Sequence, residues 1–112
     1  MIQLQNLTDQ ANQRHTVLFE ESEVIVVLRY HPTIEMWVMD VEYKGDEAKG
    51  YKLSVGVLHM ESRNFPFDFI VADTTGSGID PYRLDDFERD RCRLYMLEAD
   101  DMEAVRDAPV PL

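Results

Sequence analysis

The sequence predicts a single all-β (β-rich) domain, a small barrel or sandwich of about six short strands with a short acidic C-terminal extension. Apolar residues recur at every second position in several short segments, turn-forming residues separate these segments, and no long segment shows the 3.6-residue period of a helix. The chain has 112 residues, of which 45% are hydrophobic and 29% charged. This is enough apolar material for one core and too little chain for two.

The first half of the chain predicts a meander of antiparallel strands. Residues 13–20 alternate apolar and polar side chains, and the polar residues 21–23 predict a turn after them. Residues 23–31 contain four consecutive β-branched side chains, which predicts a central strand buried on both faces. Pro32 ends this strand because proline lacks an amide donor.

The clearest alternation lies in residues 37–44, whose aromatic and aliphatic side chains occupy every second position. We expect Trp37 and Tyr43 on the core face of this strand. A turn is predicted at 44–47, followed by a further strand over 51–58. The apolar positions of the two strands would then share one core.

The second half continues the pattern less regularly. Residues 58–64 fit a strand end, a short helix or a loop equally well. Residues 67–72 predict a strand that leads into a Gly-rich loop, and residues 84–87 are compatible with one helical turn. Residues 91–97 alternate again and predict the last strand.

The chain divides into a β-rich body over residues 1–98 and an acidic C-terminal extension over residues 99–112. The extension is compatible with a short helix through Val105. Pro109 and Pro111 cannot continue such a helix.

Charge excludes several classes of protein. Eleven Lys and Arg face 22 Asp and Glu, a formal net charge of −11, so the surface would repel a phosphate backbone and nucleic-acid binding is not expected. No apolar run approaches the roughly 20 residues of a membrane span, so no membrane partner is expected. The acidic excess fits either a solvated chain or one that docks on a basic neighbour.

The single cysteine, Cys92, cannot form an internal disulfide, and the first residues lack the basic and apolar regions of a signal peptide. Folding in a reducing compartment, the cytoplasm of the cell that makes the chain, is therefore expected.

No catalytic, cofactor-binding or metal site is expected, and the chain is not expected to be an enzyme. His15, His31 and His59 stand in strand-like or turn contexts without a zinc-binding pattern. Cys92 falls on the apolar side of its alternation, which indicates a buried, inert thiol.

The loop over residues 73–80 combines acids, hydroxyls and glycines, which invites comparison with calcium and phosphate loops. In an EF-hand register the closing acid would fall on Leu84, and the Gly-Lys-Ser/Thr ending of a phosphate loop is absent. A turn capped by its own side chains is therefore the preferred interpretation.

The arginines before and within the last strand alternate with acids. Arg89, Arg91 and Arg93 interleave with Glu88 and Asp90, which predicts local ion pairs rather than a nucleic-acid patch.

Several fragments, taken in order, resemble a known family. They are Asn12-Gln13, Leu28-Arg29-Tyr30, Trp37-Val38-Met39-Asp40, Gly56-Val57-Leu58, Asp80-Pro81-Tyr82 with Asp85-Asp86-Phe87, and Arg93-Leu94-Tyr95-Met96-Leu97. Their order and spacing over residues 2–97 resemble the small plug-type baseplate proteins of contractile-tailed bacteriophages.

The resemblance implies a β-rich structural protein of the virion, located in the tail baseplate near the tail axis. It implies contacts with the baseplate hub, tube-initiator and spike-associated proteins, several copies around the axis, no cofactor and no enzyme activity. In the resulting hypothesis the β body acts as a plug or clamp, with residues 73–90 and 99–112 as contact segments.

Two other classes remain open at this point. An acidic host-modulating protein, such as a DNA mimic, would fit the charge, although the acids are scattered between strands and turns rather than arrayed on one face. A small hydrolase lacks candidate catalytic groups, and a carbohydrate-binding module would need aromatic side chains exposed where Trp37 and Tyr43 are expected inside.

Overall fold

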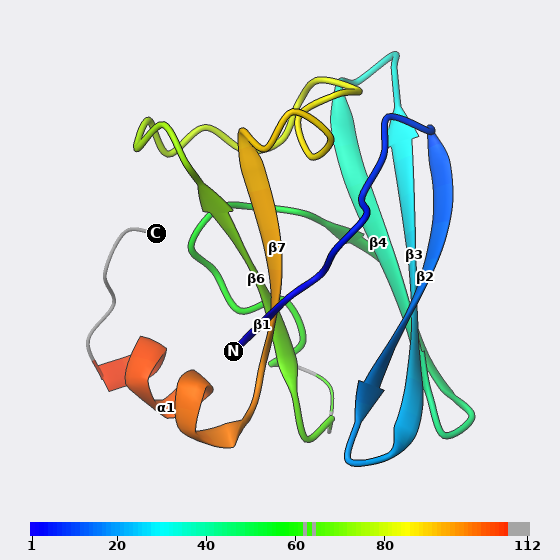
Figure 1. The fold of residues 1–112 in the computed structure, drawn as a ribbon, viewed down its shortest axis with the longest axis vertical. Coiled ribbons are helices and arrows are strands. Elements are labelled where there is room, and N and C mark those ends of the chain that lie inside the picture. The colour runs from blue at the N-terminus through cyan, green and yellow to red at the C-terminus, as the bar shows by residue number, and fades with distance from the viewer. Residues whose placement is uncertain (62, 64, 108–112) are drawn as a thin grey trace.

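The computed structural model describes residues 1–61, 63 and 65–107. Within these residues the chain forms two antiparallel sheets that face each other as an open sandwich, and a short helix follows the last strand (Figure 1). The three-stranded sheet has the order β1 (Ile2–Gln3), β7 (Cys92–Leu97), β6 (Asp68–Asp73), and the four-stranded sheet has the order β2 (Asn12–Phe19), β3 (Ser22–His31), β4 (Met36–Tyr43), β5 (Asp46–Lys52). The helix is α1 (Ala99–Asp107). The β-rich fold predicted from the sequence is confirmed.

The four-stranded sheet is a meander of hairpins. Phe19 pairs with Ser22 across a turn in which Glu20 and Glu21 both have positive φ, 49° and 69°. A second two-residue turn, Lys44-Gly45, joins β4 to β5 in the same way. Two consecutive positive φ values define the type I′ turn, whose twist matches that of the flanking strands. These turns fix the register of the sheet.

The three-stranded sheet brings distant parts of the chain together. Ile2 of β1 pairs with Met96 of β7, and Asp68 of β6 pairs with Leu97 on the other side of β7. The first and last strands of the chain therefore lie side by side, and α1 leaves the sheet directly after β7 (Figure 1).

The chain crosses from one sheet to the other after β5. The Leu53 amide donates to the Trp37 carbonyl at 2.9 Å in the four-stranded sheet. Val55 then forms a parallel bridge with Val71 of β6, and the Gly56 amide donates to the Val71 carbonyl at 3.0 Å. The crossing segment therefore covers the outer edge of β6.

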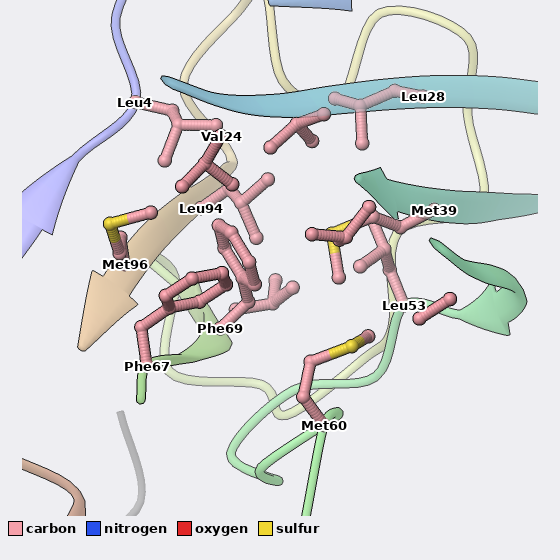
Figure 2. Close-up of a cluster of buried hydrophobic side chains, with 14 of the residues drawn as sticks. Leu4, Val24, Leu28, Met39, Leu53, Met60, Phe67, Phe69, Leu94 and Met96 are labelled. Carbon is pink, nitrogen blue, oxygen red and sulfur yellow. The ribbon is translucent and has the colours of Figure 1, made fainter. Parts of the chain in front are cut away.

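The core fills the space between the two sheets. Figure 2 shows side chains from both sheets that point toward a shared centre, such as Leu28 and Met39 from one and Phe69 and Leu94 from the other. The largest side chains that are almost completely buried are Trp37, Phe67, Phe69, Leu28, Met39, Leu53, Met60, Ile70, Leu94, Met96, Leu97 and Val24. Burial of Trp37 and of Tyr43, which is 9% exposed, confirms their predicted place on the core face.

The prediction that residues 23–31 are buried on both faces is wrong. Val24, Val26 and Leu28 have no exposed surface, whereas Ile25 and Val27 are only half-buried. The cause is that the odd-numbered side chains point to the outer face of the four-stranded sheet, over which no described element lies.

The strand predicted over residues 51–58 is displaced. The observed β5 begins at Asp46 inside the predicted turn and ends at Lys52, and Val57 is 47% exposed. β5 could not be recognised from an apolar period because most of its residues are polar. The alternation at residues 51–57 misled the prediction because part of it belongs to the segment that crosses between the sheets.

The remaining local expectations have mixed outcomes. Residues 84–87 form hydrogen-bonded turns rather than a regular helix, although the Arg89 amide donates to the Asp85 carbonyl at 2.9 Å. Residues 58–61 are irregular, the helix expected through Val105 is present as α1, and the expected break at Pro109 and Pro111 lies outside the described residues. No helix in the described part of the chain has the length and apolar character needed to cross a membrane.

Candidate docking surfaces

The loop between β6 and β7, residues 74–91, forms one end of the sandwich (Figure 1). Asp73 anchors its start, with a carboxylate that accepts hydrogen bonds from the Thr75 amide at 2.9 Å, the Thr75 hydroxyl at 2.6 Å and the Ser77 hydroxyl. The Ile79 amide also donates to it at 3.3 Å. The capped turn expected from the sequence is therefore confirmed, and the first half of the loop is held by one side chain.

Asp86 anchors the second half of the loop. Its buried carboxylate accepts hydrogen bonds from the amides of Tyr82 and Arg83, both at 2.8 Å, and from the Arg91 guanidinium at 2.8 and 2.9 Å. Arg91 also donates to the carbonyls of Ile79 and Asp80, each at 3.0 Å. This cluster fastens the loop to the start of β7.

The ion pairs predicted around the last strand are present in part. Arg93 pairs with Asp90 at 2.6 Å, as the interleaved pattern indicated. Arg91 instead reaches across the loop to Asp86 and to Asp73, whose oxygen lies 3.6 Å away. The pattern of neighbouring charges did not identify these partners because they are brought close by the loop.

The anchored loop presents a mixed surface to solvent. Ile79 and Leu84 are 51% and 40% exposed, and each is followed in the sequence by an aspartate, Asp80 and Asp85. Apolar side chains held in place by a fixed backbone lose little entropy when a partner covers them. The loop is therefore a candidate docking surface.

The helix α1 lies at the opposite end of the sandwich (Figure 1). The amino group of Met1 forms an ion pair with Asp101 at 2.8 Å, and Asp101 also accepts a hydrogen bond from the Glu98 amide at 3.1 Å. Acids in the first turn of a helix face its partial positive charge. The acidic helix is thus attached to the start of the chain as well as to β7.

The Asp73 carboxylate predicts a change of stability with pH. Hydrogen bonds from Ser77 and Thr75 hold the pKa of Asp73 well below its usual 3.8. Because the folded state favours the carboxylate, the resulting stability is complete above that usual value and disappears as the pH falls through the folded pKa. We expect Asp73→Asn to lose clearly less stability than the parent chain between pH 6 and pH 2, measured by urea unfolding. The exposed Asp46 provides the control, and an equal effect of Asp46→Asn would contradict the assignment.

Two of the three histidines, His59 and His15, form hydrogen bonds within the fold. The His59 ring donates from Nδ1 to the Phe69 carbonyl at 2.8 Å and accepts at Nε2 from the Ser54 amide at 2.9 Å. These two bonds fix its tautomer and join the crossing segment to β6. His15 lies 2.7 Å from the Gln13 side-chain oxygen.

Cys92 is 1% exposed, which confirms the prediction that it is buried. Burial raises the pKa of its thiol to about 12, and the thiolate is the reactive form. We expect a disulfide reagent to modify Cys92 at pH 8 at least about 100-fold more slowly in the native chain than in urea, where free-thiol reactivity returns. Equal rates in the two conditions would show that β7 opens in the native state.

Buried acids are the feature that sequence reasoning missed. Asp68 is 1% exposed and accepts hydrogen bonds from the amides of His59, Met60 and Phe69 at 2.9, 2.7 and 2.6 Å. Burial raises the pKa of this carboxyl, although the three amides oppose the rise. Asp68 alternates with aromatic residues as a solvent-facing residue would, so the local pattern held no signal of its burial.

The described residues include no group of three or more His, Cys, Asp or Glu side chains placed to hold a metal ion. Every buried side-chain nitrogen or oxygen in the described part of the chain has a hydrogen-bond partner. The polar interior thus serves to hold loops and strands in place.

Comparison with known proteins gives one family. The family model described as "Cyanophage baseplate Pam3 plug gp18" matches residues 1–99. No curated protein matches the chain. The matched region begins before β1 and ends at the first residue of α1, so it includes both sheets and the 74–91 loop.

Proposed function

Since this chain belongs to the family of cyanophage baseplate plug proteins, we propose that it works as a plug or clamp near the tail axis, where it binds hub and tube-initiator proteins and helps to hold the baseplate in its assembled state. The observation that carries this proposal is the match of the family model over residues 1–99. Spike-associated proteins are further proposed partners, and several copies would surround the axis. The chain would be made in the host cytoplasm and reside in the virion.

The proposed mechanism is binding without chemistry. A net charge of −11 favours basic neighbours and guides their approach and register. The 74–91 loop supplies the exposed Ile79 and Leu84 on a backbone fixed by Asp86 and Arg91. Apolar contacts surrounded by charges are typical of protein interfaces that assemble reversibly.

The family match also supports a division of the chain. The matched region ends where α1 begins, which favours a plug-like body over residues 1–98 and an added acidic extension over residues 99–112. In this proposal the extension forms a contact of its own with a basic neighbour. No site for a substrate, cofactor or metal is part of the proposal.

The proposal is tested by counting the chain in purified virions by quantitative mass spectrometry, relative to tube and hub proteins. A low and fixed copy number per particle is expected. Absence from particles, with abundant chain in infected cells, would contradict the proposal and favour an acidic host-modulating protein.

Truncation after Leu97 tests the role of the extension. We expect the shortened chain to remain folded, because α1 contacts the body mainly through β7 and the Met1–Asp101 ion pair. Incorporation into baseplates, measured by the same counting, should fall at least about tenfold, the change that about 1.4 kcal/mol of lost contact produces. Unchanged incorporation would remove the extension from the model.

A further inference from the structure

The edges of the two sheets differ in how they are protected from other strands. β5 has a register irregularity opposite Met39 and Val41 and carries Lys49 and Lys52. The outer edge of β6 is covered by the crossing segment. Bulges, lysines and covering segments are the usual means by which proteins block edge strands. β2 has eight residues, no proline and no register irregularity, so its edge is open.

The open edges of β1 and β2 border one groove. It is lined by residues 2–6 and 15–18 and has a volume of about 440 Å³. Figure 1 shows the start of the chain crossing in front of β7 and returning as β2, so the groove lies where the two sheets are not joined. We call it the edge groove.

The backbone of β2 presents unpaired groups along this edge. The pairs Phe19–Ser22 and Ala11–Tyr30, the latter with an amide–carbonyl distance of 2.7 Å, fix which residues of β2 bond to β3. In an antiparallel ladder only alternate residues exchange hydrogen bonds with a given neighbour. The N–H and C=O groups of Arg14, Thr16 and Leu18 therefore point away from β3, along the free edge of β2. Of these three residues, Thr16 and Leu18 line the edge groove.

The side chains around the groove suit an extended apolar segment. Leu4 is 5% exposed and Val17 half-buried within the groove, whereas Ile2 and Leu18 are 45% and 62% exposed at its borders. A strand that entered the groove would cover these four side chains. Added strands gain affinity from main-chain hydrogen bonds and specificity from alternate side chains.

Charge selects the kind of strand. Glu20 and Glu21 form the exposed turn directly after β2, and α1, with acids in its first turn, is attached beside Met1. The chain as a whole carries a net charge of −11, so a second copy would be repelled. A segment with lysine or arginine at its ends would be attracted.

We propose that the edge groove receives an extended segment of another baseplate protein, which pairs with Arg14, Thr16 and Leu18 of β2 as a fifth strand of the four-stranded sheet. The segment has an apolar side chain at every second position and basic residues at its ends. Its origin in the baseplate rests on the proposed function, whereas the site rests on the open edge and the groove.

Hydrogen–deuterium exchange, compared between the free chain and purified tails, tests the pairing directly. The amides of Arg14, Thr16 and Leu18 should exchange fast in the free chain and at least about tenfold more slowly in tails. The amides of Gln13, His15 and Val17 already bond to β3 and should be slow in both. Equally fast exchange at the three outward amides in tails would overturn the groove proposal while the proposed function stands, provided the chain is present in tails. Absence of the chain from tails would overturn the proposed function itself.

Binding of a second copy of this chain in the edge groove would make the exchange of these amides depend on protein concentration. Protection of Arg14, Thr16 and Leu18 that appears in the free chain as its concentration rises would overturn the proposed partner. We expect no such concentration dependence because the net charge opposes self-association.

A pair of proline variants distinguishes loss of pairing at the β2 edge from loss of the fold. Thr16→Pro removes an outward amide without touching the β2–β3 ladder, and Glu47→Pro does the same on the opposite edge of the sheet. Both variants should keep a cooperative thermal transition. Thr16→Pro should reduce incorporation into tails at least about tenfold, and Glu47→Pro should not. Equal incorporation of the two folded variants would overturn the proposal.

The charge of the partner is tested at one position. Leu18 is exposed at the border of the groove, so a polar replacement leaves the core intact. Leu18→Lys should reduce incorporation at least about tenfold, whereas Leu18→Glu should retain at least a third of it. The reverse order would overturn the proposed basic segment.

Discussion

Replacement of Asp86 by alanine is expected to lower the free energy of unfolding by about 3–5 kcal/mol, the range found when one partner of a buried ion pair is removed. The Asp86 carboxylate has no exposed surface and accepts hydrogen bonds from two amides and from the Arg91 guanidinium. In the alanine variant, the two amides and the Arg91 guanidinium lose the acceptor they share in a buried environment, where few water molecules can replace it. Urea unfolding at pH 7, followed by Trp37 fluorescence, gives the measurement.

The exposed pair Asp90–Arg93 provides the control for this prediction. Its atoms are 2.6 Å apart, and the Asp90 side chain is 52% exposed. Asparagine tolerates the positive φ of 65° at this position and removes the charge. Because water screens exposed pairs, Asp90→Asn should leave the free energy of unfolding nearly unchanged. A similar loss for Asp86→Ala and Asp90→Asn would mean that burial does not set the contribution of the Asp86 cluster.

Replacement of Phe67 by alanine is expected to lower the free energy of unfolding by about 3–5 kcal/mol, as for other buried aromatic residues. Phe67 is 1% exposed. Its ring centroid lies 5.1–5.7 Å from four others, those of Phe19, Tyr43, Phe65 and Phe69. The alanine variant would leave a cavity that rings from both sheets cannot fill without losing their mutual contacts. Urea unfolding again gives the measurement.

Phe65 is the matched control because it belongs to the same aromatic cluster but lies at its edge. It is half-buried and contacts only Tyr43 and Phe67 among the described rings. Phe65→Ala should therefore cost less than half as much as Phe67→Ala. Equal losses would mean that burial does not set the contribution of each ring in this cluster.

The strands with a solvated face could be predicted from the sequence. Trp37 and Tyr43 alternate with polar residues along β4, and the period of two directly reports which face is buried. β7 was found by the same signal, with Cys92 on the core side. Alternation predicts the buried face of these strands because each strand packs against the opposite sheet on one face only.

Alternation of apolar and polar residues did not predict burial in β3 and β5. Ile25 and Val27 are as apolar as the core residues beside them, yet they face outward. In β5 only Ala48 is fully buried, so one small residue among charges gave no period to detect. Which side of a sheet is covered depends on the whole topology, which no local window contains.

The anchors of the 74–91 loop were predictable to different degrees. Asp73 bonds to residues that follow it closely, so its capping turn could be predicted from the adjacent hydroxyl residues. The local sequence does not distinguish Asp86 from a solvated acid, because its burial follows from the way the loop folds back on Arg91. The edge groove was equally out of reach, since β1 and β2 border it only after β1 has paired with β7.

The pairing of β1 with β7 also sets the order in which the chain can finish folding. β2, β3, β4 and β5 are neighbours in sequence, so their hairpins close short loops and can form early. Ile2 of β1 can pair with Met96 only after β7, the last strand, has left the ribosome. We therefore expect the four-stranded meander to emerge during synthesis before β6 and β7 can cover its core face.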